Sequence, residues 1–387
     1  MGRGAMWEKG PRGADGKEGQ MEPLKGLRVE VAWIKEEGPM GSVVLSSRVR
    51  VARNIKGLPF PDRATPAQRR RVLSVVRKAL LEEGRWGGME FLEISSLRPW
   101  ERKTLVELNL ISPEHAHPEG ERAVVVSRDG VVSIMVNEED HFRIQCLLPG
   151  LQLHTAWQIV SQVDDLLGES VEYAFSGRYG YLTACPTNAG TGLRASVMVH
   201  VPGFALSDRV GEIFRLAREE DLIVRGIHGE GSYAAANLYQ IATRSTMGRS
   251  EGEIVSQLDR VAREIVEREN RLRVMLLRRK REELLDRVNR AYATLTSAYL
   301  IDSSEARDLL SWVKLGADLG LLPVGPKVVR RLLVCIEPGC LQTLFGGELT
   351  PYRRDVLRAR LLREALTGKA EVKPSSRVAP PRGTRFT

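Results

Sequence analysis

The chain has 387 residues, of which 42% are hydrophobic, and a formal net charge of +9 at pH 7. This size suits two or three domains with ordinary cores, and no apolar run approaches the roughly 20 residues of a membrane span. Residues 1–20 also lack the apolar core of a signal peptide. We therefore expect a cytoplasmic protein and exclude a membrane protein.

The basic charge and the cysteines narrow the possible ligands further. Arginine and glutamate are interleaved in helical stretches such as residues 278–290, which is typical of a solvated helix face, and only 6% of the residues are aromatic. We therefore do not expect nucleic acid as the ligand. Cys146, Cys185, Cys335 and Cys340 lack paired spacing, so the sequence predicts reduced thiols and no protein metal site.

Predicted strands and helices alternate up to about residue 250. A short strand at 43–45 runs into an arginine-bearing loop, and Thr65 with Gln68 predicts the start of a helix that extends to about residue 83. Asp208 is expected to cap a helix that ends near residue 220. The other predicted strands are 89–94, 123–127, 131–136, 179–184, 195–201, 222–226 and 239–243, and the other predicted helices are 99–109 and 151–167.

The pattern becomes helical from residue 250, almost without a break to about residue 290, and helices dominate to about residue 366. We therefore predict four parts. They are a flexible N-terminal extension at 1–38, a catalytic domain at 39–250, a helical domain at 251–367 and a disordered basic tail at 368–387.

One charged motif directly follows the buried strand predicted at 131–136. It reads Asn137-Glu138-Glu139-Asp140-His141-Phe142-Arg143. Carboxylates at the end of a strand lie at the rim of a sheet, because buried carboxylates need partners. These residues alone leave two interpretations open: a charged strand-to-helix turn capped by Asp140, or a general base beside a phosphate-binding arginine.

Four segments at predicted strand ends share a chemical character. They are Ser46–Arg50, Asn137–Arg143, Cys185–Arg194 and Arg225–Ser232; each carries arginine, and two are rich in glycine. Arginine makes bidentate contacts with phosphate, and glycine loops let backbone N–H groups approach an anion. Since the sequence has no Walker motif, we predict that converging arginines hold a triphosphate for phosphoryl transfer.

The same segments resemble the motifs of the ATP:guanidino phosphotransferase (phosphagen kinase) family. The resemblance lies in Ser47-Arg48-Val49-Arg50, Asn137–Arg143, Cys185-Pro186-Thr187-Asn188-x-Gly190-Thr191 and Arg194-Ala195-Ser196-Val197. Within the family the chain most resembles the bacterial protein-arginine kinases, through Leu110–Pro113, Ile144–Cys146 and Arg225–Ser232. The resemblance implies an α+β fold, in which helices flank an antiparallel sheet of the glutamine-synthetase/guanidino-kinase type, with an all-helical C-terminal domain.

The resemblance also implies ATP and Mg²⁺ as cofactors and assigns roles to individual residues. The implied catalytic residues are Glu139 as the catalytic carboxylate, Glu138 beside it, Glu230 as a second carboxylate on the substrate side, and Cys185 as the active-site thiol. The implied ATP-binding positions are Ser46, Ser47, Arg48, Val49, Arg50, Arg143, Arg194, Ala195, Ser196, Val197, Met198, Arg225, Gly226 and His228.

These roles agree with the chemistry of a guanidinium group. Its pKa above 12 makes it a poor nucleophile, so a carboxylate must orient it and take its proton. Two carboxylates, Glu139 and Glu230, suit its planar fork, and a thiolate at Cys185 adds negative charge. The chain departs from the animal enzymes at His228, where they have arginine, and at Asn109, where the family usually has a histidine near the adenine.

A second motif, Arg354-Asp355-x-x-Arg358-Ala359, lies in the helical part. By spacing alone it is a surface ladder of arginine and aspartate, whereas the resemblance implies an allosteric site for phosphoarginine. It also implies a homodimer, protein substrates, a zinc-binding activator protein and an AAA+ Clp protease. The alternatives are a kinase of a small free guanidino compound such as arginine, or an inactive regulator that binds nucleic acid or other partners.

Overall fold

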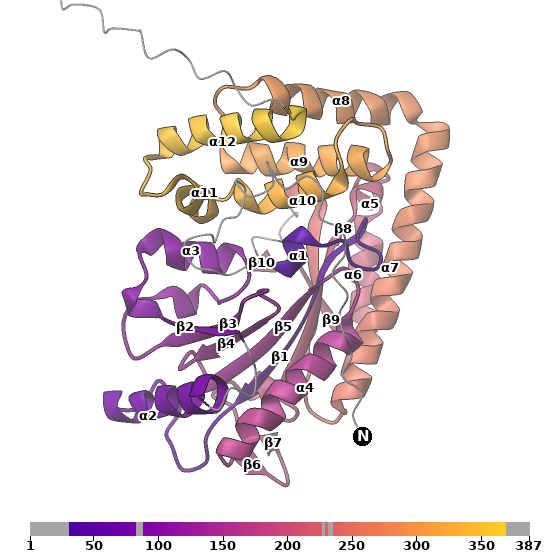
Figure 1. The fold of residues 1–387 in the computed structure, drawn as a ribbon. Helices are drawn as coiled ribbons and strands as arrows, with labels where there is room; N and C mark the ends of the chain where they lie inside the picture. Colours follow the sequence, from indigo (N-terminus) through magenta and orange to yellow (C-terminus); the bar gives the residue numbers. More distant parts are fainter. Residues whose placement is uncertain (1–30, 83–87, 227–228, 231–234, 369–387) are drawn as a thin grey trace, which may run out of the picture.

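The computed structural model describes residues 31–82, 88–226, 229–230 and 235–368. Its main feature is a nine-stranded antiparallel sheet in the order β10-β9-β11-β8-β1-β5-β4-β3-β2 (Figure 1). Helices flank the sheet, and a helical region follows it in the chain. The predicted α+β fold is confirmed.

The strands and helices have the following bounds. The strands are β1 (Val44–Arg53), β2 (Met89–Glu93), β3 (Ala123–Ser127), β4 (Val132–Val136), β5 (Phe142–Pro149), β6 (Phe175–Ser176), β7 (Gly180–Tyr181), β8 (Leu193–His200), β9 (Leu222–Gly226), β10 (Gly229–Glu230) and β11 (Leu238–Thr243). The helices are α1 (Ala32–Lys35), α2 (Pro66–Arg77), α3 (Pro99–Glu107), α4 (Leu153–Ser170), α5 (Pro202–Leu206), α6 (Val210–Glu219), α7 (Glu251–Arg279), α8 (Arg281–Ser297), α9 (Ser303–Asp318), α10 (Pro326–Cys335), α11 (Pro338–Phe345) and α12 (Pro351–Thr367).

Strand β1 lies at the centre of the sheet and corrects one prediction. It pairs with β5 on one side and β8 on the other, so Ser46–Arg50 is the middle of a ten-residue strand and not a loop. Successive side chains of a strand point to opposite faces. Val49 and Val51 therefore enter the core, while Arg48 and Arg50 share the other face. Arginine and valine alternate in this segment because one face of the strand is polar. The prediction took the arginines as a sign of a loop.

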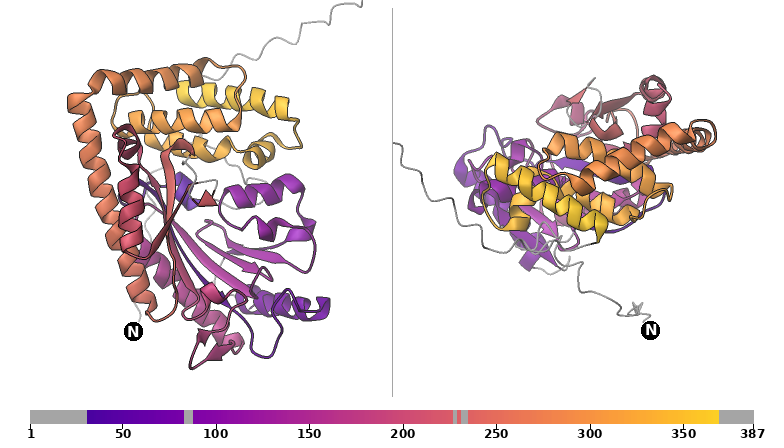
Figure 2. Two further views of the ribbon diagram at one scale, coloured as in Figure 1. Left: turned by 180° about the vertical axis from the view of Figure 1, so that it is seen from behind. Right: turned by 90° about the horizontal axis from the view of Figure 1, so that it is seen from above.

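The core behind the sheet is formed by β1, β8 and the helices α4 and α7. Ile254, Leu258 and Ile265 of α7 are buried in the same cluster as Val197 of β8. Figure 2 shows α7 running beside the sheet before it turns sharply into α8. By its packing α7 belongs with the sheet, so the predicted boundary after residue 250 separates residues that share a core.

The segment before β1 also differs from its prediction. Val31, Trp33 and Ile34 are buried against α3 and the front of the sheet, and the indole N–H of Trp33 donates to Leu108 O at 3.2 Å. Residues 31–35 are thus part of the core rather than of a flexible extension, because their apolar side chains bury area that free chain would leave in water. Residues 1–30 lie outside the described residues.

Local signals predicted some helix ends and missed others. Thr65 and Gln68 form the predicted capping box of α2. Asp208 does not cap α6; it has φ 56° in the turn after α5, and Arg209 occupies the cap position. The strand predicted at 179–184 is reduced to β7, because most of this segment is irregular.

Buried charges fasten the helical region to the sheet. Lys314 of α9 pairs with Asp318 at 2.7 Å and also donates to Ser42 O, just before β1, at 3.1 Å. Arg273 of α7 pairs with Glu269 at 2.7 Å and donates to His200 O, at the end of β8, at 3.2 Å. Both strands that carry the central arginines are thus anchored to helices at one end. Among the described helices, none has the length and apolar character needed to cross a membrane.

Candidate active site

The open face of the sheet carries an arginine cluster contributed by four strands. Cross-strand register places Arg50 of β1 opposite Arg194 of β8, and Arg48 lies two residues along β1 on the same face. Arg143 of β5 and Arg225 of β9 complete the cluster, and all five arginines line one cavity of about 720 Å³. Tertiary structure therefore brings together arginines that are separated by up to 177 positions, from 48 to 225.

The electrostatics of this cavity favour an anion. Burial, together with the charges of Arg143 and Arg194, lowers the pKa of Arg48 to about 10. Burial and the positive charges of neighbouring arginines also lower the pKa of Arg50 and of Arg194. Within the described part of the chain, neither Arg48 nor Arg50 forms an ion pair with a carboxylate. A polyanion such as a triphosphate would relieve their mutual repulsion.

Glu138 lies in the tight turn between β4 and β5, where it holds Arg143. One carboxylate oxygen accepts from Ser112 Oγ at 2.6 Å, and the other accepts from Arg143 Nη1 at 2.5 Å. Burial opposes its ionisation, but Arg143 and these hydrogen bonds lower its pKa to about 2. A carboxylate so acidic is a poor base. The geometry therefore gives Glu138 a supporting contact, whereas the sequence assigned it to the catalytic group.

Glu139, in contrast, is exposed and lines the cavity beside the arginines. Partial burial and the neighbouring charge of Asp140 raise its pKa, against the opposing effect of Arg143. A carboxylate with a raised pKa at the edge of a cation cluster suits a general base. Of the two open interpretations, the geometry favours the base. The motif is a strand-to-strand turn, so Asp140 does not cap a helix.

Cys185 lies in the irregular segment between β7 and β8. Its sulfur is 3.0 Å from Thr187 Oγ1, and its side chain is half-buried, whereas the other three cysteines are buried. None of the four forms a disulfide. Cys185 is therefore the accessible thiol, on the loop that also leads to Arg194.

Several predicted ATP-binding residues do not face the cavity. The side chains of Val49, Ala195 and Val197 are buried in the core on the opposite face of the sheet. Ser47 is fully buried; its Oγ donates to Gly150 O at 2.7 Å and accepts from Gln152 N at 2.9 Å near the start of α4. The period of two along a strand explains this division, because the motif residues alternate between the two faces.

The remaining predicted positions divide into two groups. Ser46, Ser196 and Met198 share the face of the arginine cluster by register, and Gly226 pairs with Tyr239 and Gly229 at the edge of the sheet. Glu230 of β10 pairs through its backbone with Arg225 of β9. The Glu230 side chain and His228 lie outside the described residues.

The structure also identifies lining residues that the motif analysis did not assign. Arg122 and Gln145 both line the cavity. Gln145 Nε2 donates to Asn109 O at 2.7 Å, and Asn109 itself lines the cavity with φ 60°. Since Gln145 lies two residues after Arg143 on β5, strand alternation was the available signal for its orientation.

The second predicted site, on α12, is only partly accessible. Arg358 is buried, and it donates to Ile336 O at 2.7 Å, Ile301 O at 2.9 Å and Asp355 Oδ1 at 2.6 Å. Ala359 is fully buried, while Arg354 is half-buried and donates to Leu349 O. The motif is thus not a surface ladder, and Asp355 is paired with Arg358.

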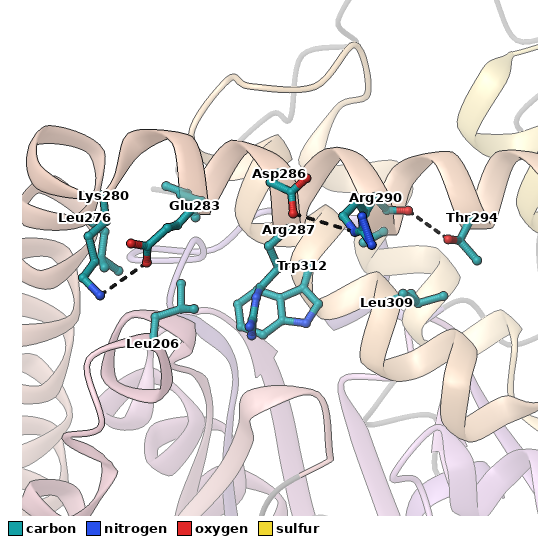
Figure 3. A pocket seen from close by; sticks show the side chains of 12 residues that line it. Leu206, Leu276, Lys280, Glu283, Asp286, Arg287, Arg290, Thr294, Leu309 and Trp312 are labelled. Atoms are coloured by element: carbon teal, nitrogen blue, oxygen red, sulfur yellow. Dashed lines mark hydrogen bonds and ion pairs between the residues drawn. The ribbon is translucent and has the colours of Figure 1, made fainter.

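A separate cavity of about 590 Å³ lies between α7, α8 and α9 (Figure 3). Several of its lining side chains are apolar, and its charged side chains already have partners. Lys280 pairs with Glu283 at 3.3 Å, Arg290 pairs with Asp286 at 3.7 Å, and Arg287 lies over the Trp312 ring at 4.7 Å. The arginine cavity is therefore the better candidate for a charged substrate.

Comparison with known proteins agrees with this geometry. The family model of the ATP:guanido phosphotransferase C-terminal catalytic domain matches residues 71–272, and that of the protein-arginine kinase McsB C-terminal domain matches residues 281–377. The interval between the two matches coincides with the end of α7. This supports the assignment of α7 to the sheet by its packing.

Curated relatives match along most of the chain. A protein-arginine kinase of Symbiobacterium thermophilum is 44% identical over 344 residues, which cover 88% of this chain and 98% of the relative. A protein-arginine kinase of Halothermothrix orenii is 45% identical over 335 residues, covering 86% and 96%. Among solved structures, a lombricine kinase matches with a TM-score of 0.54 at 25% identity, covering 65% of this chain and 71% of that one.

Proposed function

The chain belongs to the ATP:guanido phosphotransferase family, and from this premise we propose that it is a protein-arginine kinase that phosphorylates arginine side chains of proteins with ATP. The single observation that carries the proposal is the arrangement of Glu139 at the edge of a cavity lined by six arginines, the cluster of five and Arg122. The arginines suit a polyphosphate, and the carboxylate suits a cationic acceptor that must lose a proton. The names of the relatives above support arginine in proteins as the acceptor.

In this reaction a guanidinium nitrogen forms a bond with the γ-phosphorus of ATP, and the bond between that phosphorus and the bridging oxygen breaks. Arg48, Arg50 and Arg194 would bind phosphate oxygens and stabilise charge on the leaving ADP. Glu139 would accept the guanidinium proton as the N–P bond forms. The thiol of Cys185 lies on the adjacent loop, where a thiolate would stabilise the cationic acceptor.

Mg²⁺ fits this site as an ion carried by the nucleotide. Within the described residues no group of three or more His, Cys, Asp or Glu side chains could hold a metal ion, and Mg²⁺ is usually held by substrate phosphates with one or two carboxylates. Glu139 is the candidate carboxylate in the motif, because it lines the cavity, whereas Asp140 is buried and accepts from Asn54 and Ala184. When bound, the ion would neutralise charge on the phosphates.

The test is transfer of labelled phosphate from ATP to casein, to free arginine and to no acceptor, followed by treatment of the product with acid and with base. A phosphoramidate N–P bond breaks on protonation, so we expect label on casein that acid removes and base leaves. Label only on free arginine would support a small-molecule kinase instead. Acid-stable label on serine or threonine would refute guanidino transfer.

The proposal extends to assembly, partners and location. We propose a cytoplasmic homodimer in which α8–α12 form the dimerisation domain, acting with a zinc-binding activator protein and marking substrates for an AAA+ Clp protease. These partners follow from the family resemblance. Light scattering of the purified chain tests the dimer. Co-purification with the activator protein and with the Clp protease tests the two interactions.

The phosphoarginine site on α12 also stays a proposal. Arg354 has the accessibility for it, whereas Arg358 and Asp355 already bind each other. A ligand at this position would therefore have to contact Arg354 first and share Arg358 with the carbonyl groups of Ile301 and Ile336.

A further inference from the structure

We propose that Asp140 is a positioning residue for phosphoryl transfer, because it ties the turn that carries Glu139 to the loop that carries Cys185. The inference rests on the proposed function for the roles of Glu139 and Cys185. The contact itself is a property of the fold. Neither of the roles predicted for Asp140, a helix cap or a member of a family motif, includes this contact.

One oxygen of Asp140 makes the connection. Asp140 Oδ1 accepts from the backbone N–H of Ala184 at 2.7 Å and from Asn54 Nδ2 at 2.6 Å. Glu139 immediately precedes Asp140, and Cys185 immediately follows Ala184. Each end of this bridge is therefore one residue from a group proposed to act on the substrate.

Asn54 makes the bridge rigid by joining three segments. Its Oδ1 accepts from the backbone N–H of His141 at 2.9 Å, and its Nδ2 also donates to Leu182 O at 3.0 Å. Asn54 and Asp140 are each only 1% exposed. Buried polar groups that share several hydrogen bonds specify one arrangement, because a displacement would leave a donor or acceptor without a partner.

His141 fixes the same turn a second time. Its Nδ1 accepts from the backbone N–H of Ile55 at 3.0 Å, and its Nε2 lies 2.9 Å from Pro59 O, to which it must donate. This is the neutral ring, in agreement with a pKa that burial lowers. The turn is thus held firmly to the segment after β1, and Asp140 extends this rigid body to the Cys185 loop.

The Cys185 loop has a different anchor on its other side. Thr246 Oγ1 donates to Thr187 O at 3.2 Å, and it also bonds to Ala189 O. That anchor does not reach the Glu139 turn. Among the described side chains of that turn, Asp140 alone bonds to the backbone of the Cys185 loop. Loss of this contact would let the distance between carboxylate and thiol vary.

Two substitutions separate the hydrogen bonds of Asp140 from its charge. Asp140→Asn keeps an Oδ1 that can accept from Ala184 and Asn54. Asp140→Ala removes both contacts and with them the direct bond between the turn and Ala184. Asp259→Asn is the matched control, because Asp259 of α7 is also a buried carboxylate, paired with Arg263 at 2.6 Å, and neither residue of this pair lies in the Glu139 turn or the Cys185 loop. Each variant is assayed for kcat, for KM of ATP and for its melting temperature.

We expect Asp140→Ala to lower kcat by about 100-fold, since a misplacement of about 1 Å costs that much, with little change in KM for ATP. Asp140→Asn should recover most of the rate. The charge of Asp140 helps to raise the pKa of Glu139, and Asp140→Asn removes that charge. The acid limb of the pH–rate profile of Asp140→Asn should therefore lie at lower pH than in the wild type. Asp259→Asn should melt at a lower temperature but keep its kcat at a temperature where it is folded.

A second readout follows the bridge without turnover. Cys185 is the accessible thiol, so its rate of alkylation by iodoacetamide reports on the local loop. Asp140→Ala should change this rate several-fold, while Asp140→Asn and Asp259→Asn should resemble the wild type. If wild-type enzyme transfers no phosphate to any acceptor, the proposed function fails, yet the alkylation rates still test the bridge.

The inference is overturned by either of two results. One is wild-type kcat in folded Asp140→Ala. The other is a lowered kcat with unchanged Cys185 alkylation, which would show that Asp140 does not couple the two loops.

Discussion

Arg143 of β5 and Glu138 of the turn before it form an ion pair whose atoms, Nη1 and Oε2, lie 2.5 Å apart. The pair is mostly buried, with side-chain exposures of 14% and 5%. It leaves Glu138 ionised and points Arg143 into the cluster that lines the cavity. Glu139, the next residue, is then the carboxylate that remains available for a substrate. Neighbouring acids thus acquire different chemistry from their surroundings.

Glu139→Gln should abolish phosphoryl transfer and leave ATP binding nearly intact. The amide cannot take the guanidinium proton, and loss of a general base costs about 10²–10⁴ in rate. Because the pKa of Glu139 is raised above 4.5, the wild-type rate should fall as pH decreases through that raised value, where the base becomes protonated. Steady-state rates and calorimetric titration with ATP measure the two effects. Wild-type turnover of the variant would contradict the assignment.

Arg194→Ala should weaken ATP binding and lower kcat together. A charge-assisted hydrogen bond contributes about 1.5–3 kcal/mol, which corresponds to roughly 10- to 150-fold in affinity. Arg209→Ala is the control, because Arg209 pairs with Glu212 on the surface away from the cavity. It should bind ATP like the wild type. Unchanged ATP affinity in Arg194→Ala would argue against the arginine cluster as the phosphate site.

Arg358→Ala should unfold more readily than the wild type. It would leave the carbonyl groups of Ile336 and Ile301 without their donor, at a cost of about 2–4 kcal/mol in the free energy of unfolding. Arg354→Ala should have a much smaller effect, because its side chain is only half-buried. Urea unfolding of both variants measures the difference, and equal stability would contradict the burial of Arg358.

Arg354→Ala also tests the proposed phosphoarginine site, because it retains the fold. We expect it to lose binding of phosphoarginine and activation by it while ATP affinity stays unchanged. A coupling between the two sites of about 1–3 kcal/mol is the usual range for allostery. Calorimetric titration with phosphoarginine is the measurement. Binding as tight as in the wild type would remove Arg354 from the site.

The free energy of unfolding should decrease as pH falls below about 6.5. His115 is buried, and its Nε2 lies 2.9 Å from Ala123 O, while its Nδ1 has no hydrogen-bond partner among the described residues. Burial lowers the pKa of His115 from 6.5 to about 4. Between these values the unfolded chain binds a proton that the folded protein excludes, so acid favours unfolding. The slope is about 1.4 kcal/mol per pH unit for each such histidine.

His115→Asn should reduce that slope, whereas exposed His117→Asn should leave it unchanged. Urea unfolding at several pH values between 4 and 6.5 gives the slope for each protein. A slope in His115→Asn equal to that of the wild type would show that His115 is protonated in the folded state.

The sequence by itself determined the chemistry of the site. Arginines in four segments and three consecutive acids predicted a phosphate site beside a carboxylate, because arginine binds phosphate with two hydrogen bonds and an acid can accept a proton. The capping box at Thr65 and the neighbouring strands at 123–127 and 131–136 were also predictable, since their hydrogen bonds are local. The residues that form such local interactions lie within a few positions of each other in the sequence.

Only the tertiary structure decided which of these residues act on a ligand. Whether Arg48 faced the cavity and Val49 the core depended on β5 and β8 lying on either side of β1. Glu138 and Glu139 were equivalent in the sequence until Ser112 and Arg143 engaged the first of them. Likewise, the burial of Arg358 depends on carbonyl groups 22 and 57 residues away. The physical reason is that pKa, accessibility and orientation depend on neighbours in space, which the order of residues along the chain does not specify.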